Sequence, residues 1–253
     1  MQDNKISQRQ ILRSLLRADA RVQRRQSRSI LMSTLFALII LFTWRGFVGK
    51  SGLTDWQHVL LATCLSIVLA GMGILGYPAL VARDRDNGVF QRLRVTPASS
   101  SSIMLSRLVI QALVIGTLSV TIMIVAAADQ ITLTPVAYLL TLCASVLGSV
   151  MYLSVGQLLV ALIASQSTLN ATGRVIYFPV VMFGGLAELH VFGSVTEKIV
   201  AWSPYGTVQS VMQAAMQPAQ WSVHTWLSLV VTLAYTALFA VVGIRYFRWV
   251  SKA

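Results

Sequence analysis

Long apolar runs alternate with short polar connections along most of the chain. A helix that crosses the hydrocarbon core of a bilayer needs about 20 mostly apolar residues. Five runs reach that length and another is shorter; in chain order they cover about residues 29–48, 59–82, 103–128, 135–164, 175–186 (the short one) and 226–247. The pattern predicts an all-α integral membrane protein with six transmembrane helices.

The composition supports a membrane protein and excludes several kinds of site. Of the 253 residues 56% are hydrophobic and 11% are charged, whereas a soluble domain carries roughly 25% charged residues. Both cysteines, Cys64 and Cys143, lie inside apolar runs and are interpreted as small core residues. The three histidines are scattered, without metal-ligand spacing. We therefore expect no disulfide framework, metal site or catalytic residue.

The basic residues are distributed unevenly between the two sides of the predicted membrane segments. Of the 20 Lys and Arg residues, all but Arg45, Lys50 and Lys198 fall in the N-terminal segment, the second-to-third or fourth-to-fifth connection, or the C-terminus. Because cytoplasmic loops carry the excess of Lys and Arg, both termini are predicted to be cytoplasmic. The same bias accounts for most of the formal net charge of +12.

The N-terminal segment, residues 1–28, has a basic face and an apolar face. The basic face carries Arg9, Arg13, Arg17, Arg21 and Arg24, and apolar residues fill another face. This spacing predicts an amphipathic helix at the cytoplasmic membrane surface. A simple topology signal is the alternative. Residues 29–253 are expected to form one six-span domain.

The connection RDRDNGVFQRLRVTP, residues 83–97, is densely charged. It cannot lie in the bilayer, because each charge there costs roughly 2.5–3.5 kcal/mol. Phe90 and Leu93 share helical spacing, Gly88 favours a turn before them, and Pro97 ends a helix. The stretch predicts a short amphipathic helix on the cytoplasmic side; a solvated charged loop is the alternative.

The connection before the last span, about residues 187–223, is too apolar for an ordinary outer loop. Glu188, Glu197 and Lys198 nevertheless prevent one long span. Two short helices that dip back into the membrane from the outer side fit this composition. An interfacial packing cap is the alternative.

Two nucleotide-binding motifs are matched only superficially. The stretch GMGILG, residues 71–76, has the letters of a dinucleotide fingerprint but lies inside an apolar span, without the strand and the later acid that the motif requires. Its small residues instead favour close helix packing. WRGFVGKS, residues 44–51, has Trp44 where a phosphate loop needs glycine. We expect no ATPase site in this chain.

Two stretches carry a resemblance to a known family. Arg83-Asp84-Arg85-Asp86-Asn87-Gly88, followed by Leu93 and Thr96-Pro97, closely resembles the charged–Gly–Leu–Thr-Pro signature of the membrane subunits of ATP-binding-cassette exporters. These are the six-span drug, lipid and polysaccharide exporters, the daunorubicin-resistance-like group among them. Ser203-Pro204-Tyr205-Gly206 resembles the family's Pro-containing segment, although Gln209 and Gln213 stand where many members have an acid and an arginine.

The resemblance implies roles for particular residues. The charged connection would be the coupling helix that sits in a groove of a separate ATPase subunit, and the N-terminal helix would border the same subunit. The implied ATPase-coupling residues are Arg83, Asp84, Arg85, Asp86, Gly88, Phe90, Leu93, Thr96 and Pro97. The substrate pathway would run between two protomers, mainly along the second and fifth spans. Its candidates, which could also be ordinary packing residues, are Met72, Tyr77, Tyr177, Phe178, Met182 and Phe183.

The resemblance therefore implies a permease that moves an amphipathic or hydrophobic drug or lipid out across the bacterial plasma (inner) membrane. Its partners would be an ATPase that binds ATP and Mg²⁺, an identical or related permease, and lipid, with no nucleic acid and no cofactor in this chain. A polysaccharide exporter of the same family is an alternative, although only 9% of the residues are aromatic. An ion-coupled secondary transporter is another, but the spans lack the central Asp or Glu that such carriers use.

Overall fold

The computed structural model describes residues 17, 35, 38–43, 45–46, 56–89, 100–129, 131–187 and 193–246, without the side chains of 100–105. Every element within these residues is helical. In chain order the elements are α3 (Trp56–Ala70), η1 (Gly71–Gly76), α4 (Tyr77–Asp86), α6 (Ser100–Ala128), α7 (Pro135–Leu162), α8 (Gln166–Ala187), α9 (Ser194–Ala201), α10 (Pro204–Met216), η2 (Pro218–Gln220) and α11 (Val223–Arg245). The N-terminal helix predicted over 1–28 and most of the first span lie outside the described residues.

Four described helices are long and apolar enough to cross a membrane. They are the continuous helix Trp56–Asp86 formed by α3, η1 and α4, then Ser106–Ala128 of α6, Pro135–Leu162 and Val223–Arg245. They coincide with the second, third, fourth and sixth predicted spans. The fifth predicted span lies within α8, which begins earlier than expected. Six spans in total therefore stay a prediction.

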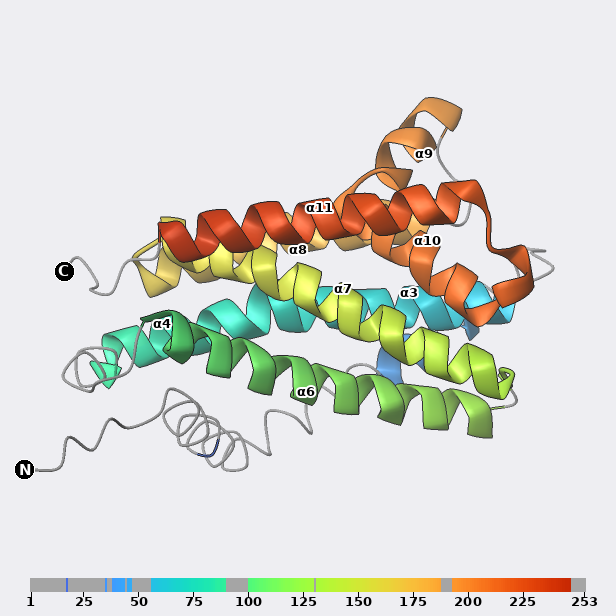
Figure 1. Cartoon of the computed structure of the whole chain (residues 1–253), viewed down its shortest axis with the longest axis horizontal. Coiled ribbons are helices and arrows are strands. Elements are labelled where there is room, and N and C mark those ends of the chain that lie inside the picture. The colour runs from blue at the N-terminus through green and yellow to red at the C-terminus, as the bar shows by residue number, and fades with distance from the viewer. Residues whose placement is uncertain are drawn as a thin grey trace, which may run out of the picture.

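The long helices lie alongside one another in an elongated bundle with α7 at its centre (Figure 1). Helix α7 contacts α3, η1, α4, α6, α10 and α11. We call the end of the bundle at which α4 finishes and α6 begins the charged end. The opposite end, where α3, α7 and α11 begin, is called the far end. The described part of the first predicted span joins this bundle, because Leu41 is buried in the core and Arg45 pairs with Asp129 after α6.

The glycine-rich stretch that resembles a dinucleotide fingerprint forms a close contact between two helices. It adopts a π-helical turn, η1, inside the long helix. A Cβ added to Gly73 would lie 2.5 Å from Tyr152 Cβ, and one added to Gly156 would lie 2.1 Å from the Gly73 carbonyl oxygen. Glycine lets the two backbones touch, as is common between membrane helices. The predicted close packing is confirmed at this position.

Polar side chains inside the bundle tie its helices together. Tyr77 of α4 donates a hydrogen bond to Gln157 of α7, whose amide nitrogen lies 3.4 Å from the Gly243 carbonyl oxygen of α11. Both side chains are fully buried. Buried polar groups need such partners because no water or lipid group replaces them. Three helices are thereby fixed in register.

The predicted outer segment contains two short helices that differ in their packing. Helix α9 buries none of its residues and projects sideways from the bundle (Figure 1). Helix α10 buries most of its residues against α3, α7 and α11. Residues 188–192, at the start of this segment, lie outside the described part of the chain.

One expectation about the core is wrong. Cys64 is buried as expected, but Cys143 is exposed on α7. A membrane helix is apolar on every side, including the sides that face lipid. Hydropathy alone could therefore not tell which face of this span points inward.

Candidate functional site

The charged connection begins as the last turn of α4. The four residues 83–86 continue the long helix, which ends at Asp86. The Asn87 N–H donates to the Arg83 carbonyl at 2.9 Å, and Gly88 has a φ of 67°. This left-handed backbone is favourable for glycine and closes the helix end. The predicted turn at this glycine is confirmed. Phe90, Leu93, Thr96 and Pro97 lie outside the described residues, so the short helix after the turn stays a prediction.

Arg85 points into the bundle and caps another helix. Its guanidinium donates to the carbonyl oxygens of Val160, Ile163 and Ala164 at 2.8, 3.1 and 3.3 Å, and the residue is only 4% exposed. These carbonyls stand at the end of α7, where no further turn supplies N–H donors. A cation there also meets the negative end of the helix dipole. Arg85 therefore fastens the end of α4 to the end of α7.

Asp84 makes a second inward contact. Its carboxylate accepts a hydrogen bond from Arg107 near the start of α6, and the two side chains are 19% and 10% exposed. The pairing is charge-assisted and largely withdrawn from water, which makes it stronger than an exposed ion pair. It joins the helix before the charged connection to the helix after it. The end of α4 is thus fastened to the first part of α6.

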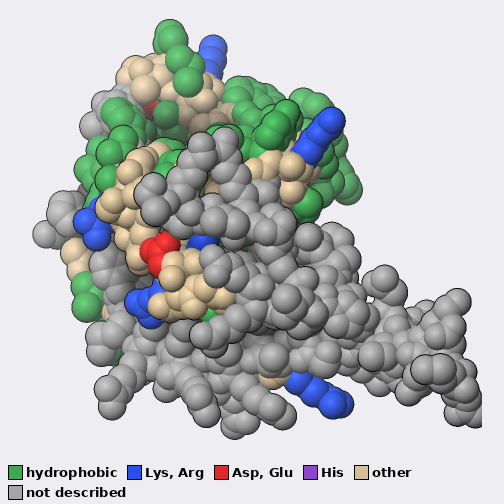
Figure 2. Space-filling model, turned by 90° about the vertical axis from the view of Figure 1, so that its left-hand side faces the viewer, with side chains coloured by type: hydrophobic (Ala, Val, Ile, Leu, Met, Phe, Trp, Pro, Cys, Tyr) green, Lys and Arg blue, Asp and Glu red, His purple; other side chains and the backbone are tan. Residues whose placement is uncertain are grey.

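Arg83 and Asp86 are exposed, unlike the two residues between them. Figure 2 looks onto the charged end, where described acidic and basic side chains lie close together. The four charges therefore divide into an inward pair, which anchors the helix end, and an outward pair, which is accessible to a partner. The site therefore presents a charged surface that is fixed to the helices behind it.

The inward direction of Arg85 was missed in the sequence, although a signal for it exists. Tyr77, Val81 and Arg85 are spaced by four residues and all three are buried on one face of α4. A charge that continues an apolar helical stripe predicts a buried partner. Its partners on α7 lie 75 to 79 positions away in the chain, and no local pattern points to them.

The six candidate pathway residues separate into two groups. Tyr77 is buried against Gln157, and Tyr177 is buried with its hydroxyl donating to the Ile67 carbonyl at 3.3 Å. Met72 is partly buried. By contrast, the remaining three lie exposed along α8; they are Phe178, Met182 and Phe183. Only this second group forms an open face that a substrate or a second protomer could contact.

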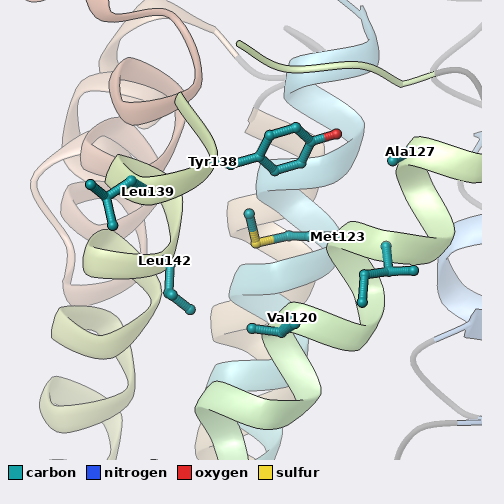
Figure 3. Close-up of a pocket in the computed structure, with 7 residues that line it drawn as sticks. Val120, Met123, Ala127, Tyr138, Leu139 and Leu142 are labelled. Carbon is teal, nitrogen blue, oxygen red and sulfur yellow. The ribbon is translucent and has the colours of Figure 1, made fainter. Parts of the chain in front are cut away.

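An apolar groove of about 460 Å³ lies between α6 and α7 (Figure 3). The lining residues labelled in Figure 3 are Val120, Met123 and Ala127 of α6 and Tyr138, Leu139 and Leu142 of α7. The lining is almost entirely apolar, and none of the candidate residues contributes to it. The charged end, and not this groove, therefore contains the described candidate residues of the coupling segment.

No group of three His, Cys, Asp or Glu side chains within the described ranges is arranged to hold a metal ion.

A comparison with protein families gives a direct assignment. A model of the family described as ABC-2 type transporter matches residues 10–217. The chain belongs to this family. The matched range covers every described helix from α3 to α10. No curated protein matches the chain significantly.

Membership in the ABC-2 type transporter family confirms the resemblance carried by the charged connection. The chain is a multi-pass membrane protein and a permease subunit of an ATP-binding-cassette transporter. A permease of this kind is not itself the ATPase, and the family implies a separate ATPase subunit as its partner.

Proposed function

We propose that the permease exports an amphipathic or hydrophobic substrate, a drug or a lipid, across the bacterial plasma membrane, and that its ATPase docks at the charged end. The observation that carries this proposal is that the four charged residues from Arg83 to Asp86 divide into an inward pair and an outward pair. Two of them bind the helix ends behind the surface, and two remain exposed beside the Gly88 turn. When a partner displaces such a surface, the displacement is transmitted to the helices behind it.

The contacts define how this displacement reaches the other helices. Movement of the segment after Gly88 is transmitted by Arg85 to the end of α7, and by Asp84 and Arg107 to the start of α6. Helix α8 begins only a few residues after the α7 carbonyls that Arg85 holds. The same displacement therefore reaches α8, which carries the open face of Phe178, Met182 and Phe183. Phe90, Leu93, Thr96 and Pro97 would form the part of the segment that enters the ATPase.

The orientation follows from charge. Since the basic connections belong on the cytoplasmic side, we place the charged end, both termini and the predicted interface helix over 1–28 there. The far end then faces outward. Helix α10 fits a re-entrant element: Val208, near its start, packs against Gly148 in the middle of α7, whereas Gln217, just beyond its end, hydrogen-bonds His58 at the far end. It thus covers about the outer half of the bundle.

The transporter would contain two permeases, identical or related, above two ATPase subunits that bind ATP and Mg²⁺. The open apolar face of α8 suits a pathway between the two protomers, and its Met and Phe side chains adapt to flexible apolar substrates. Carboxylates within the four candidate spans occur only as Asp84 and Asp86, at the charged end. An ion-coupled carrier would need one deeper in the membrane, so ATP-driven transport is favoured.

The test changes the outward surface and leaves the inward contacts intact. The double variant Asp86→Ala with Phe90→Ala should insert normally but lose the co-purifying ATPase, or hydrolyse ATP without export, because an aromatic anchor commonly contributes about 2 kcal/mol or more to docking. Trp226→Ala, which changes an exposed aromatic residue at the far end, is the control and should retain both ATPase co-purification and export. Wild-type co-purification and export by the double variant would show that this stretch is only a solvated loop.

A further inference from the structure

A cavity of about 300 Å³ with both polar and apolar wall residues lies near the far end, between α8, α9, α10 and α11. Its wall includes Gly184 at the end of α8, Tyr205 and Gln213 of α10, Glu197 of α9 and His224 of α11. The volume is at the lower end of the range found for small-molecule sites. No residue assigned to ATPase docking or to the predicted pathway contributes to it.

Close contacts hold the walls of this cavity in place. A Cβ on Gly184 would lie 2.2 Å from the Tyr205 ring, so the end of α8 touches the start of α10 directly. The Tyr235 hydroxyl donates to the Trp202 carbonyl at 3.0 Å. The Trp202 ring packs against His224, with 5.0 Å between ring centroids. Helix α9, which has no buried residue of its own, is thereby positioned over the cavity by the turn that follows it.

The lining has the chemistry of a cation site. Glu197 supplies a carboxylate, while Ser210 and Gln213 supply acceptor atoms and His224 an imidazole ring. None of the described residues in the lining is Lys or Arg. Tyr205 contributes an aromatic ring, to which cations are attracted.

The cavity lies at the same end of α8 as Phe183, the last residue of the open face. Gly184 and Ala187 line it, and Phe183 is the residue immediately before. An amphipathic molecule could therefore keep its apolar part on the face formed by Phe178, Met182 and Phe183 while its head group enters the cavity. Amphipathic molecules with a positive head group are the class that matches both surfaces.

We propose that this cavity binds the organic ammonium group of the exported substrate, with Glu197 as its counter-ion. The proposal rests on the proposed export function and specifies the substrate class. A carboxylate in a half-buried site attracts a cation much more strongly than one in bulk water, because the effective dielectric constant is lower. Ser210 and Gln213 orient the head group, and Tyr205 provides the aromatic wall.

The test is a binding measurement without ATP, on the permease–ATPase complex in nanodiscs of zwitterionic lipid. The probes are radiolabelled decyltrimethylammonium and decyldimethylamine oxide, whose head groups are similar in size but differ in net charge. Wild-type protein should bind the ammonium more tightly. Glu197→Gln should raise its Kd by about tenfold, which corresponds to about 1.4 kcal/mol, and should change the Kd of the amine oxide by less than about twofold.

Two further variants make the outcome decisive. Asp129→Asn removes the same charge at the same end of the bundle but outside the cavity, and should leave ammonium binding unchanged. Gln213→Glu adds a second carboxylate to the wall and should tighten ammonium binding by at least about threefold. This gain cannot arise from misfolding, so it tests the proposal even if Glu197→Gln folds poorly.

An equal loss of affinity for both probes in Glu197→Gln would indicate a packing role for this residue and overturn the proposal. Ammonium binding that neither Glu197→Gln nor Gln213→Glu alters would overturn it as well. A wild-type protein without preference for the ammonium would overturn it too. ATP hydrolysis by the same preparations reports separately on the proposed function. Normal hydrolysis without ammonium selectivity refutes only the cation site, whereas absence of an associated ATPase refutes the export function beneath it.

Discussion

Replacing Arg85 with Met should weaken the fold at the charged end by about 3 kcal/mol. Its three hydrogen bonds to the carbonyls at the end of α7 would be lost, each worth about 1.5 to 3 kcal/mol because the donor is charged. Removal of the favourable charge at the helix end adds up to about 1 kcal/mol. Relief of the guanidinium's desolvation, since the residue is only 4% exposed, offsets part of this loss.

Thermal unfolding of the purified permease in nanodiscs measures the effect. For a chain of this size, about 3 kcal/mol lowers Tm by roughly 6–12 °C. Arg85→Lys should fall between wild type and Arg85→Met, because an ammonium lacks the planar fork that reaches several carbonyls at once. Arg83→Met is the matched control: Arg83 is exposed two positions away, so its Tm should change by only about 1–2 °C. Equal Tm values for Arg83→Met and Arg85→Met would refute the capping role.

Three further predictions concern packing, topology and hydrolysis. Gly73→Ala should destabilise the bundle by about 3 kcal/mol in the same assay, because its Cβ would meet the Tyr152 backbone. Gly116→Ala, with open space around it, should be neutral, and equal Tm values for the two variants would contradict this packing. In a background without Cys64 and Cys143, Lys198→Cys should be labelled by an impermeant maleimide in intact cells and Asp86→Cys only after permeabilisation; labelling of Asp86→Cys in intact cells would invert the orientation. The purified chain alone should hydrolyse no ATP, and hydrolysis that survives removal of every co-purifying protein would contradict the assignment.

Local sequence patterns predicted the features that depend on neighbouring residues. The positions of four membrane helices follow from uninterrupted apolar runs. The turn at Gly88 follows from an Asn-Gly pair at a helix end, and the close contact at Gly73 follows from small residues within a span. The sequence signal for each of these features lies within one short stretch of chain. The family resemblance rested on the same charged stretch and is confirmed by the family match.

The features that the sequence did not predict depend on residues far apart in the chain. Arg85 belongs to a dense group of charges, and hydropathy alone places such a group at the surface; its burial depends on the end of α7. The exposure of Cys143 was missed because lipid-facing and core-facing positions are equally apolar. The far-end cavity draws Gly184, Glu197, Gln213 and His224 from four helices, so no single stretch carries its signature.

The docking of the ATPase at the charged end can be tested by site-specific photo-crosslinking in cells. A photoreactive phenylalanine analogue would replace Asp86, which is exposed beside the Gly88 turn, or Phe90 in the predicted docking helix. The same analogue at Val223, 76% exposed at the far end, is the control. We predict that Asp86 and Phe90 crosslink to an ATP-hydrolysing subunit and that Val223 does not. Crosslinking of that subunit from Val223, or its absence from both charged-end positions while the complex still hydrolyses ATP, would contradict the proposed function.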